Sequence, residues 1–141
     1  MFKFLIPLAL LFTSCSAEDW KIHRIVKLKK DKIEKILVRS ESYEKLLTFR
    51  WTLYHNKWLV FFVSFNGFVQ QHLLALNNYN QSIRIDLLTR GRTRLPPPMM
   101  LIKFKKFDFI KNRAHFELLM RDKDDKVELK FLNKRVGVEE P

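Results

Sequence analysis

Two apolar runs joined by an Asn-Gly pair decide the fold: Trp58-Leu59-Val60-Phe61-Phe62-Val63-Ser64-Phe65, then Asn66-Gly67, then Phe68-Val69-Gln70-Gln71-His72-Leu73-Leu74-Ala75-Leu76. Asn and Gly both tolerate the positive φ angles of a type I′ turn, so the pair predicts a β-hairpin. A two-residue loop pairs Phe65 with Phe68 and, in the same register, Phe61 with His72. The first run is apolar on both faces, which predicts a strand buried between two layers.

Alternating apolar residues predict further strands on both sides of this hairpin. Residues 45–54 place Leu47, Phe49, Trp51 and Leu53 on one face, and these residues continue the hairpin into a three-strand meander. Residues 21–40 fit either two strands joined near Lys30-Asp31 or an amphipathic helix, and the β-rich surroundings favour the strands. The remaining predicted strands are 82–88, 99–109, 114–120 and 127–131.

Short strands at this spacing predict an all-β fold, an antiparallel β-sandwich of about eight strands. An immunoglobulin-like arrangement is the leading version, although the chain has a single cysteine and so lacks the cysteine pair of antibody domains. A small β-barrel is the alternative. The predicted domain spans residues 20–133, and residues 134–141 are expected to form a loose tail.

The first residues predict secretion. Lys3 and the apolar run from Phe4 to Phe12 have the layout of a bacterial signal peptide. A membrane-spanning helix needs roughly 20 apolar residues, and the charged Asp19 comes too soon for one. Residues 1–14 are therefore interpreted as a cleaved leader.

The segment Phe12-Thr13-Ser14-Cys15 resembles the lipobox of bacterial lipoproteins, in which a lipidated cysteine becomes the new N-terminus. Phe12 departs from the leucine usual at that position. The resemblance implies a diacylglyceryl thioether on Cys15, a further amide-linked acyl chain such as palmitate, and a tether over residues 15–19. It places the domain in the cell envelope, at the outer membrane or on the periplasmic face of a membrane. Cleavage after Ala17 would instead leave a soluble periplasmic or secreted protein.

The chain is strongly basic, with 27 Lys and Arg against 15 Asp and Glu and a net charge of +12. Outside the inner membrane the abundant polyanions are lipid head groups, lipopolysaccharide phosphates and acidic glycans, so no nucleic-acid partner is expected. Guanidinium and ammonium groups bind such anions well. Two clusters are candidate anion- or partner-binding sites, namely Arg90, Arg92 and Arg94 before three prolines, and Lys27, Lys29 and Lys30.

Catalytic and metal-binding motifs are missing from the sequence. None of the four histidines has a His or Cys at metal-ligand spacing. Asp122, Asp124 and Asp125 are interpreted as a solvated hairpin tip. A hydrolase would need a trio from distant strands, such as Ser64, His72 and Asp86, which no spacing favours. No metal and no cofactor are expected.

We therefore predict a non-enzymatic, membrane-tethered envelope lipoprotein that acts as a protein-binding or assembly module. Another envelope protein is the expected partner, held by the Arg90–Pro98 loop or by an open sheet edge. The alternative function is binding of anionic lipid or glycan through the basic clusters and an apolar pocket.

Overall fold

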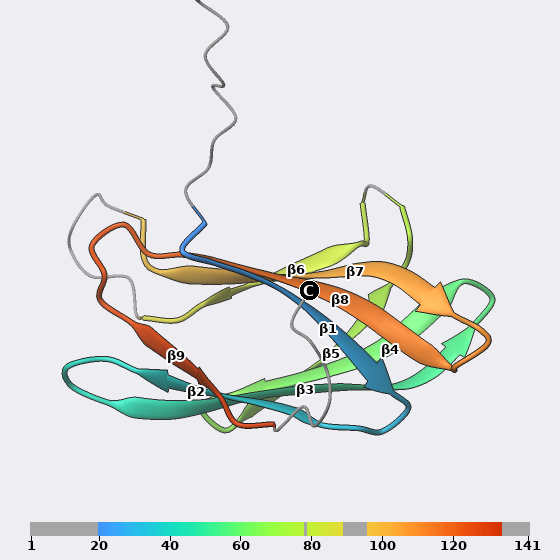
Figure 1. Ribbon diagram of the computed structural model, residues 1–141, viewed down its shortest axis with the longest axis horizontal. Coiled ribbons are helices and arrows are strands. Elements are labelled where there is room, and N and C mark those ends of the chain that lie inside the picture. Colours follow the sequence, from blue (N-terminus) through green and yellow to red (C-terminus); the bar gives the residue numbers. More distant parts are fainter. Residues whose placement is uncertain (1–19, 78, 89–95, 134–141) are drawn as a thin grey trace, which may run out of the picture.

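The computed structural model describes residues 20–77, 79–88 and 96–133, and within these residues the chain forms nine strands and no helix (Figure 1). The strands are β1 (Ile22–Lys29), β2 (Glu34–Arg39), β3 (Glu44–His55), β4 (Trp58–Phe65), β5 (Phe68–Leu74), β6 (Ser82–Asp86), β7 (Met99–Asp108), β8 (Arg113–Arg121) and β9 (Glu128–Phe131). The predicted leader, tether and tail lie outside the described residues.

The strands form two antiparallel sheets that pack face to face as the two layers of Figure 1. Sheet A has the strand order β1-β8-β7-β6, and sheet B has the order β5-β4-β3-β2-β9. The predicted β-sandwich is confirmed, and the sheets are not closed into a barrel. The connectivity differs from the immunoglobulin order, because four consecutive strands, β2 to β5, form one meander within sheet B.

The hairpin predicted from Asn66-Gly67 is confirmed. Both turn residues have positive φ, 55° at Asn66 and 82° at Gly67, and Phe65 pairs with Phe68 and Phe61 with His72. The prediction that β4 is buried on both faces is wrong. Val60 and Phe62 are only half-buried, because sheet B is an outer layer of the sandwich and its far side has no further sheet among the described residues.

A β-bulge in β3 changes which side chain enters the core. The register between β3 and β4 shifts between Trp51 and Leu53. Two residues then oppose one, and the alternation of side chains reverses beyond the bulge. Leu53, expected on the inner face, is 51% exposed, and Tyr54 turns inward and stacks on Phe107 with ring centroids 4.3 Å apart.

Residues 21–40 form two strands, so the helical alternative is excluded. The turn between β1 and β2 includes Asp31 at a φ of 63°, and it carries the chain from sheet A to sheet B. The strand β2 is not at an edge, because β9 pairs with its outer side. The strands β6 and β7, which precede and follow residues 89–95, are neighbours in sheet A.

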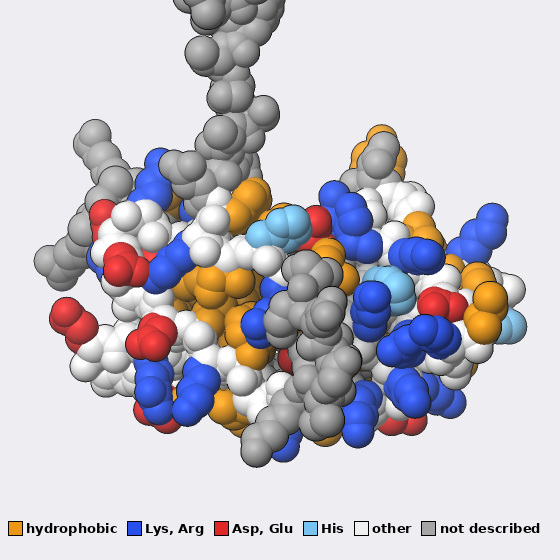
Figure 2. All heavy atoms as spheres, in the orientation of Figure 1, with side chains coloured by type: hydrophobic (Ala, Val, Ile, Leu, Met, Phe, Trp, Pro, Cys, Tyr) orange, Lys and Arg blue, Asp and Glu red, His pale blue; other side chains and the backbone are white. Residues whose placement is uncertain are grey.

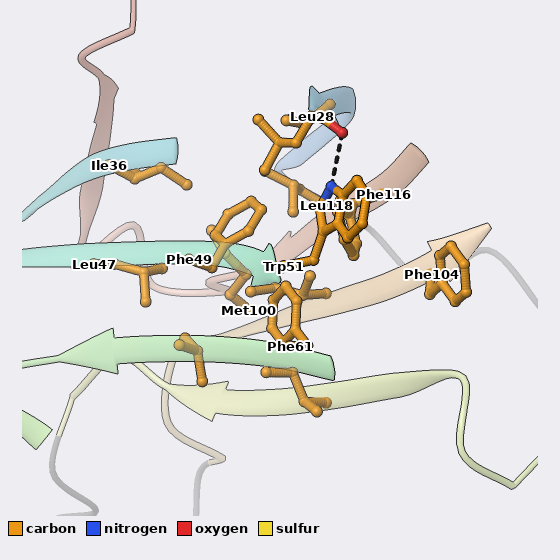
Figure 3. Close-up of a cluster of buried hydrophobic side chains, with 14 of the residues drawn as sticks. Leu28, Ile36, Leu47, Phe49, Trp51, Phe61, Met100, Phe104, Phe116 and Leu118 are labelled. Carbon is orange, nitrogen blue, oxygen red and sulfur yellow. Dashed lines mark hydrogen bonds between the residues drawn. The ribbon is translucent and has the colours of Figure 1, made fainter. Parts of the chain in front are cut away.

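Aromatic residues of the two sheets interlock in the core (Figure 3). Phe61 of sheet B packs against Phe116 of sheet A with ring centroids 5.2 Å apart. The Trp51 side chain crosses the same space, and its Nε1 donates a 2.8 Å hydrogen bond to the carbonyl oxygen of Leu28 on β1. The buried positions alternate along β1 and β8. The residues between them therefore face outward on sheet A.

Candidate functional site

A row of basic residues crosses the outer face of sheet A. Lys27 of β1 pairs with His115 of β8, and His115 pairs with Lys106 of β7. We call Lys27, His115 and Lys106 the central row. Adjacent strands lie about 4.8 Å apart, and residues directly opposite each other have Cβ atoms about 5 Å apart. The side chains of two lysines therefore flank that of one histidine.

The neighbouring rows contain acidic residues that the central row lacks. On one side lie Lys29, Arg113 and Asp108 in register. On the other side Glu117 accepts a 2.8 Å hydrogen bond from His23 Nε2 when that nitrogen carries the proton. Figure 2 shows Lys and Arg side chains gathered over the surface where β1 and β7 end in Figure 1. We call the central row with Lys29, Lys103 and Arg113 the basic face.

The electrostatic environment of His115 reflects this arrangement. Partial burial lowers the pKa of His115, and the charges of Lys27 and Lys106 lower it further. Asp108 acts in the opposite direction and Arg113 adds to the lowering. Nε2 of His115 is buried and has no hydrogen-bond partner among the described residues. No acceptor therefore stabilises the imidazolium at that atom, and the neutral ring is favoured.

Like charges placed directly across strands destabilise a sheet. Protonation of His115 would place a cation directly opposite both Lys27 and Lys106, so the row has an electrostatic cost when the imidazole is charged in the unbound protein. Such departures from local stability rules concentrate at functional sites. A bound anion would remove the repulsion, since phosphate oxygens accept hydrogen bonds from ammonium and imidazolium groups.

The hairpin between β7 and β8 carries apolar residues at its tip, next to the basic face. Phe109 is 76% exposed and Ile110 is 96% exposed. Asp108 Oδ1 accepts hydrogen bonds from the backbone N–H groups of Ile110 at 3.0 Å and Lys111 at 3.1 Å, which stabilises the turn. The N–H of Lys111 is the main cause that lowers the pKa of Asp108.

The edge strand β5, unlike the basic face, has no charged residue. No Lys, Arg, Asp or Glu occurs between Trp58 and Ile83, and β5 is an end strand of sheet B. Phe68 and Val69 are 73% and 69% exposed. Natural edge strands are usually protected by charges, prolines or bulges, and β5 has no charge and no proline.

The structure brings some predicted residues together and separates others. Lys27 and Lys29 lie on the basic face, whereas Lys30 lies in the turn after β1, beside a cleft of about 270 Å³. Cys15 and the three arginines lie outside the described residues. Sequence reasoning missed the basic residues that β7 and β8 contribute: Lys103, Lys106, Arg113 and His115. The alternation of Lys103 and Phe104 was a signal, but the bulge between Phe104 and Lys106 hides the continuation.

The interpretation of the acidic loop is wrong for Asp122. This side chain is buried, and its Oδ2 accepts a 2.7 Å hydrogen bond from the N–H of Val127. It also lies 3.5 Å from the ammonium of Lys21. Burial acts to lower the pKa of Lys21, but the hydrogen bond to Asp125 and the charge of Asp122 outweigh it and raise the pKa. The loop crosses between the sheets and is not a hairpin tip.

The hypothetical hydrolase trio is not assembled. Ser64 pairs with Val69 and His72 with Phe61. Successive strand residues alternate between faces, so these two side chains lie on opposite faces of sheet B. Asp86 belongs to the other sheet. Within residues 20–77, 79–88 and 96–133, no group of three or more His, Cys, Asp and Glu side chains could hold a metal ion.

No protein-family model matches the chain, and no match was found among curated proteins or among solved structures. In the part of the chain that the structure describes, no helix is long and apolar enough to span a membrane.

Proposed function

We propose that the protein is a non-enzymatic, membrane-tethered module of the bacterial cell envelope whose basic face binds anionic phosphate or carboxylate groups. The lipid anchor on Cys15 would hold the domain at the membrane, where phospholipid head groups and acidic glycans are concentrated. The observation that carries the proposal is the central row, in which Lys27 and Lys106 flank His115 without a carboxylate in the row.

Tethering makes a weak surface interaction effective. Binding to anionic lipid gains about 1 kcal/mol for each basic residue near the surface, and a second contact made by an anchored domain is effectively intramolecular. The basic residues come from three strands of a packed sheet. Their spacing is therefore maintained by backbone pairing, and little ordering is required on binding.

Binding to anionic vesicles tests the proposal. The chain from Ser16 to Pro141 would be mixed with vesicles of phosphatidylcholine containing phosphatidylglycerol and measured by co-sedimentation. We expect affinity to fall steeply as salt rises, because screening weakens exposed charge interactions. Lys27→Glu with Lys106→Glu should reduce the affinity by at least about tenfold.

Lys35→Glu with Lys130→Glu is the matched control. Both residues are exposed, and they lie on the adjacent strands β2 and β9 of sheet B. The control changes the net charge equally and leaves the basic face intact. An equal loss of affinity in both double variants would contradict a specific basic face, since only net charge would then matter.

A second candidate function is capture of an envelope protein partner by the edge strand β5, and the neutral sequence of that strand favours it. Extended segments add to exposed sheet edges by main-chain hydrogen bonds, with side-chain pockets supplying specificity. A cleft of about 380 Å³ beside this edge is lined by both Phe68 and Arg84. Crosslinking in the native envelope would test this function. Val69→Lys should abolish a stoichiometric crosslink if β5 is the contact, whereas a crosslink that survives the change would exclude β5.

A further inference from the structure

The β7–β8 hairpin tip has the properties of an element that enters a lipid bilayer. Phe109 and Ile110 are adjacent and largely exposed. The ring of Phe109 contacts Phe107, with centroids 4.9 Å apart, and the ring of Tyr54 at 5.9 Å. Phe107 is itself buried in the core. The tip therefore projects from a packed base.

Most charged residues around this tip are basic, and the exception, Asp108, accepts hydrogen bonds from the backbone of Ile110 and Lys111. Lys105 and Lys106 precede it on β7, Lys111 lies within the turn, and Arg113 begins β8. Lys29 is in register with Arg113. Interfacial membrane elements combine Phe, Trp or Leu with surrounding Lys and Arg, so that apolar groups enter the acyl boundary while cations contact the head groups. A soluble anionic glycan offers the cations a partner but leaves Phe109 and Ile110 in water.

The shape of the tip also favours a bilayer over a protein. Protein interfaces place their main anchors in well-packed pockets of the partner. A two-residue apolar projection with several lysines and an arginine nearby would need a protein pocket with acidic residues around it, whereas an anionic bilayer offers an apolar interior beneath negatively charged head groups over its whole surface. The basic residues around the tip are therefore complementary in charge to a fluid anionic surface.

The tip lies at the opposite end of sheet A from the start of the described chain. Ile22 pairs with Met120, and Lys29 pairs with Arg113 beside the tip. The eight residues of β1 extend about 26 Å at roughly 3.3 Å per residue. The proposed tether of residues 15–19 can extend up to about 17 Å. The anchor and the tip can therefore contact one bilayer at the two ends of the basic face.

We propose that Phe109 and Ile110 insert into the interface of a bilayer rich in anionic phospholipid, so that sheet A lies with its basic face along the membrane. This inference rests on the proposed function and specifies its ligand as anionic phospholipid in a bilayer. The domain would then be held at three places: the acylated Cys15, the basic face and the hairpin tip.

A polarity-sensitive fluorophore tests the insertion locally. Cys15 is the only cysteine, so the chain from Ser16 to Pro141 carrying Ile110→Cys can be labelled with NBD at one position. The matched control is the same chain carrying Phe68→Cys, which places the label at the other exposed apolar hairpin. Both chains would be mixed with phosphatidylcholine vesicles with and without phosphatidylglycerol. We expect a blue shift and a several-fold increase in emission only for the label at 110 and only with phosphatidylglycerol.

Two labelling results would overturn the inference. Equal changes at positions 110 and 68 would mean that the hairpin has no special contact with lipid. An unchanged signal at 110 would exclude insertion. If Lys27→Glu with Lys106→Glu still weakens vesicle binding in that case, the proposed function stands and only the insertion is wrong. If vesicle binding is independent of phosphatidylglycerol, both proposals are wrong.

Unlabelled variants give an independent measurement. Phe109→Ser with Ile110→Ser should weaken binding of the chain from Ser16 to Pro141 to phosphatidylglycerol vesicles by on the order of tenfold or more, because apolar burial is lost. Phe68→Ser with Val69→Ser should leave it unchanged. Circular dichroism would establish that both double variants fold. Equal affinities of the two double variants would overturn the insertion.

Discussion

His115 lies directly opposite Lys27 on the outer face of sheet A, although the two residues are far apart in the chain. Partial burial lowers the pKa of His115, and the charges of Lys27 and Lys106 lower it further. The basic face therefore has a component that titrates below neutral pH. Acidification protonates His115 and so increases the positive charge that the basic face presents to an anionic surface. The same protonation increases the repulsion between the cations of the face.

Replacing His115 should make the fold less sensitive to mild acid. A folded-state pKa below the unfolded value means that the unfolded chain binds the proton more readily, so stability is lost as the pH falls through the unfolded pKa of about 6.5. Asp108 also has a lowered pKa, but carboxylate stability of this kind is lost only below about pH 4. Urea unfolding at pH 7.5 and pH 5.5 should show a smaller difference for His115→Asn than for the wild type. Equal differences would contradict the assignment.

Trp51→Phe should destabilise the sandwich. The change removes the hydrogen bond from Trp51 Nε1 to Leu28 and leaves a smaller ring in the core. A lost buried partner and a small cavity together cost about 1–3 kcal/mol. Trp58→Phe is the control, because Trp58 is 41% exposed and its replacement should change the free energy of unfolding by less than about 0.5 kcal/mol. Similar losses of unfolding free energy for both variants in urea titrations would show that the hydrogen bond between Trp51 and Leu28 contributes little to stability.

The crossing from β8 to β9 should depend on Asp122. Asp122→Ala leaves the N–H of Val127 without its acceptor and Lys21 without its most buried carboxylate. An unpaired buried donor costs about 1–3 kcal/mol. Asp124→Ala removes a half-exposed carboxylate from the same loop and should cost less than about 0.5 kcal/mol. Thermal unfolding of both variants measures the difference in their stability. The two variants would be equally stable if the loop were simply solvated.

Mass spectrometry of the protein isolated from membranes should identify an acylated N-terminal cysteine at position 15. Lipidation at the lipobox-like segment requires the Cys15 thiol. Cys15→Ala should therefore abolish the mass that the acyl chains add and release the protein from the membrane fraction. Wild-type protein that begins at Glu18 without acyl chains would end the lipoprotein interpretation and leave the basic face to act in solution.

Local sequence was sufficient for most of the fold. The conformational freedom of Asn66 and Gly67 predicted a turn, and the period-two alternation along the chain predicted strands, because both depend on neighbouring residues only. The same local information failed at Leu53. The bulge depends on how β3 bends against β4 and against the opposite sheet. No residue near Leu53 indicates it in the sequence.

The sequence by itself determined that this is a basic all-β domain with cations at Lys27 and Lys29 available to anions, and it predicts a secretory leader before that domain. Only the tertiary structure decided that Lys106 and His115 join Lys27 in one row, that β5 is an edge, and that Phe109 and Ile110 stand exposed at the end of the basic face. The physical reason is that sheet register is a property of paired strands. It joins residues distant in the chain, and a one-residue slip would turn each of them to the opposite face.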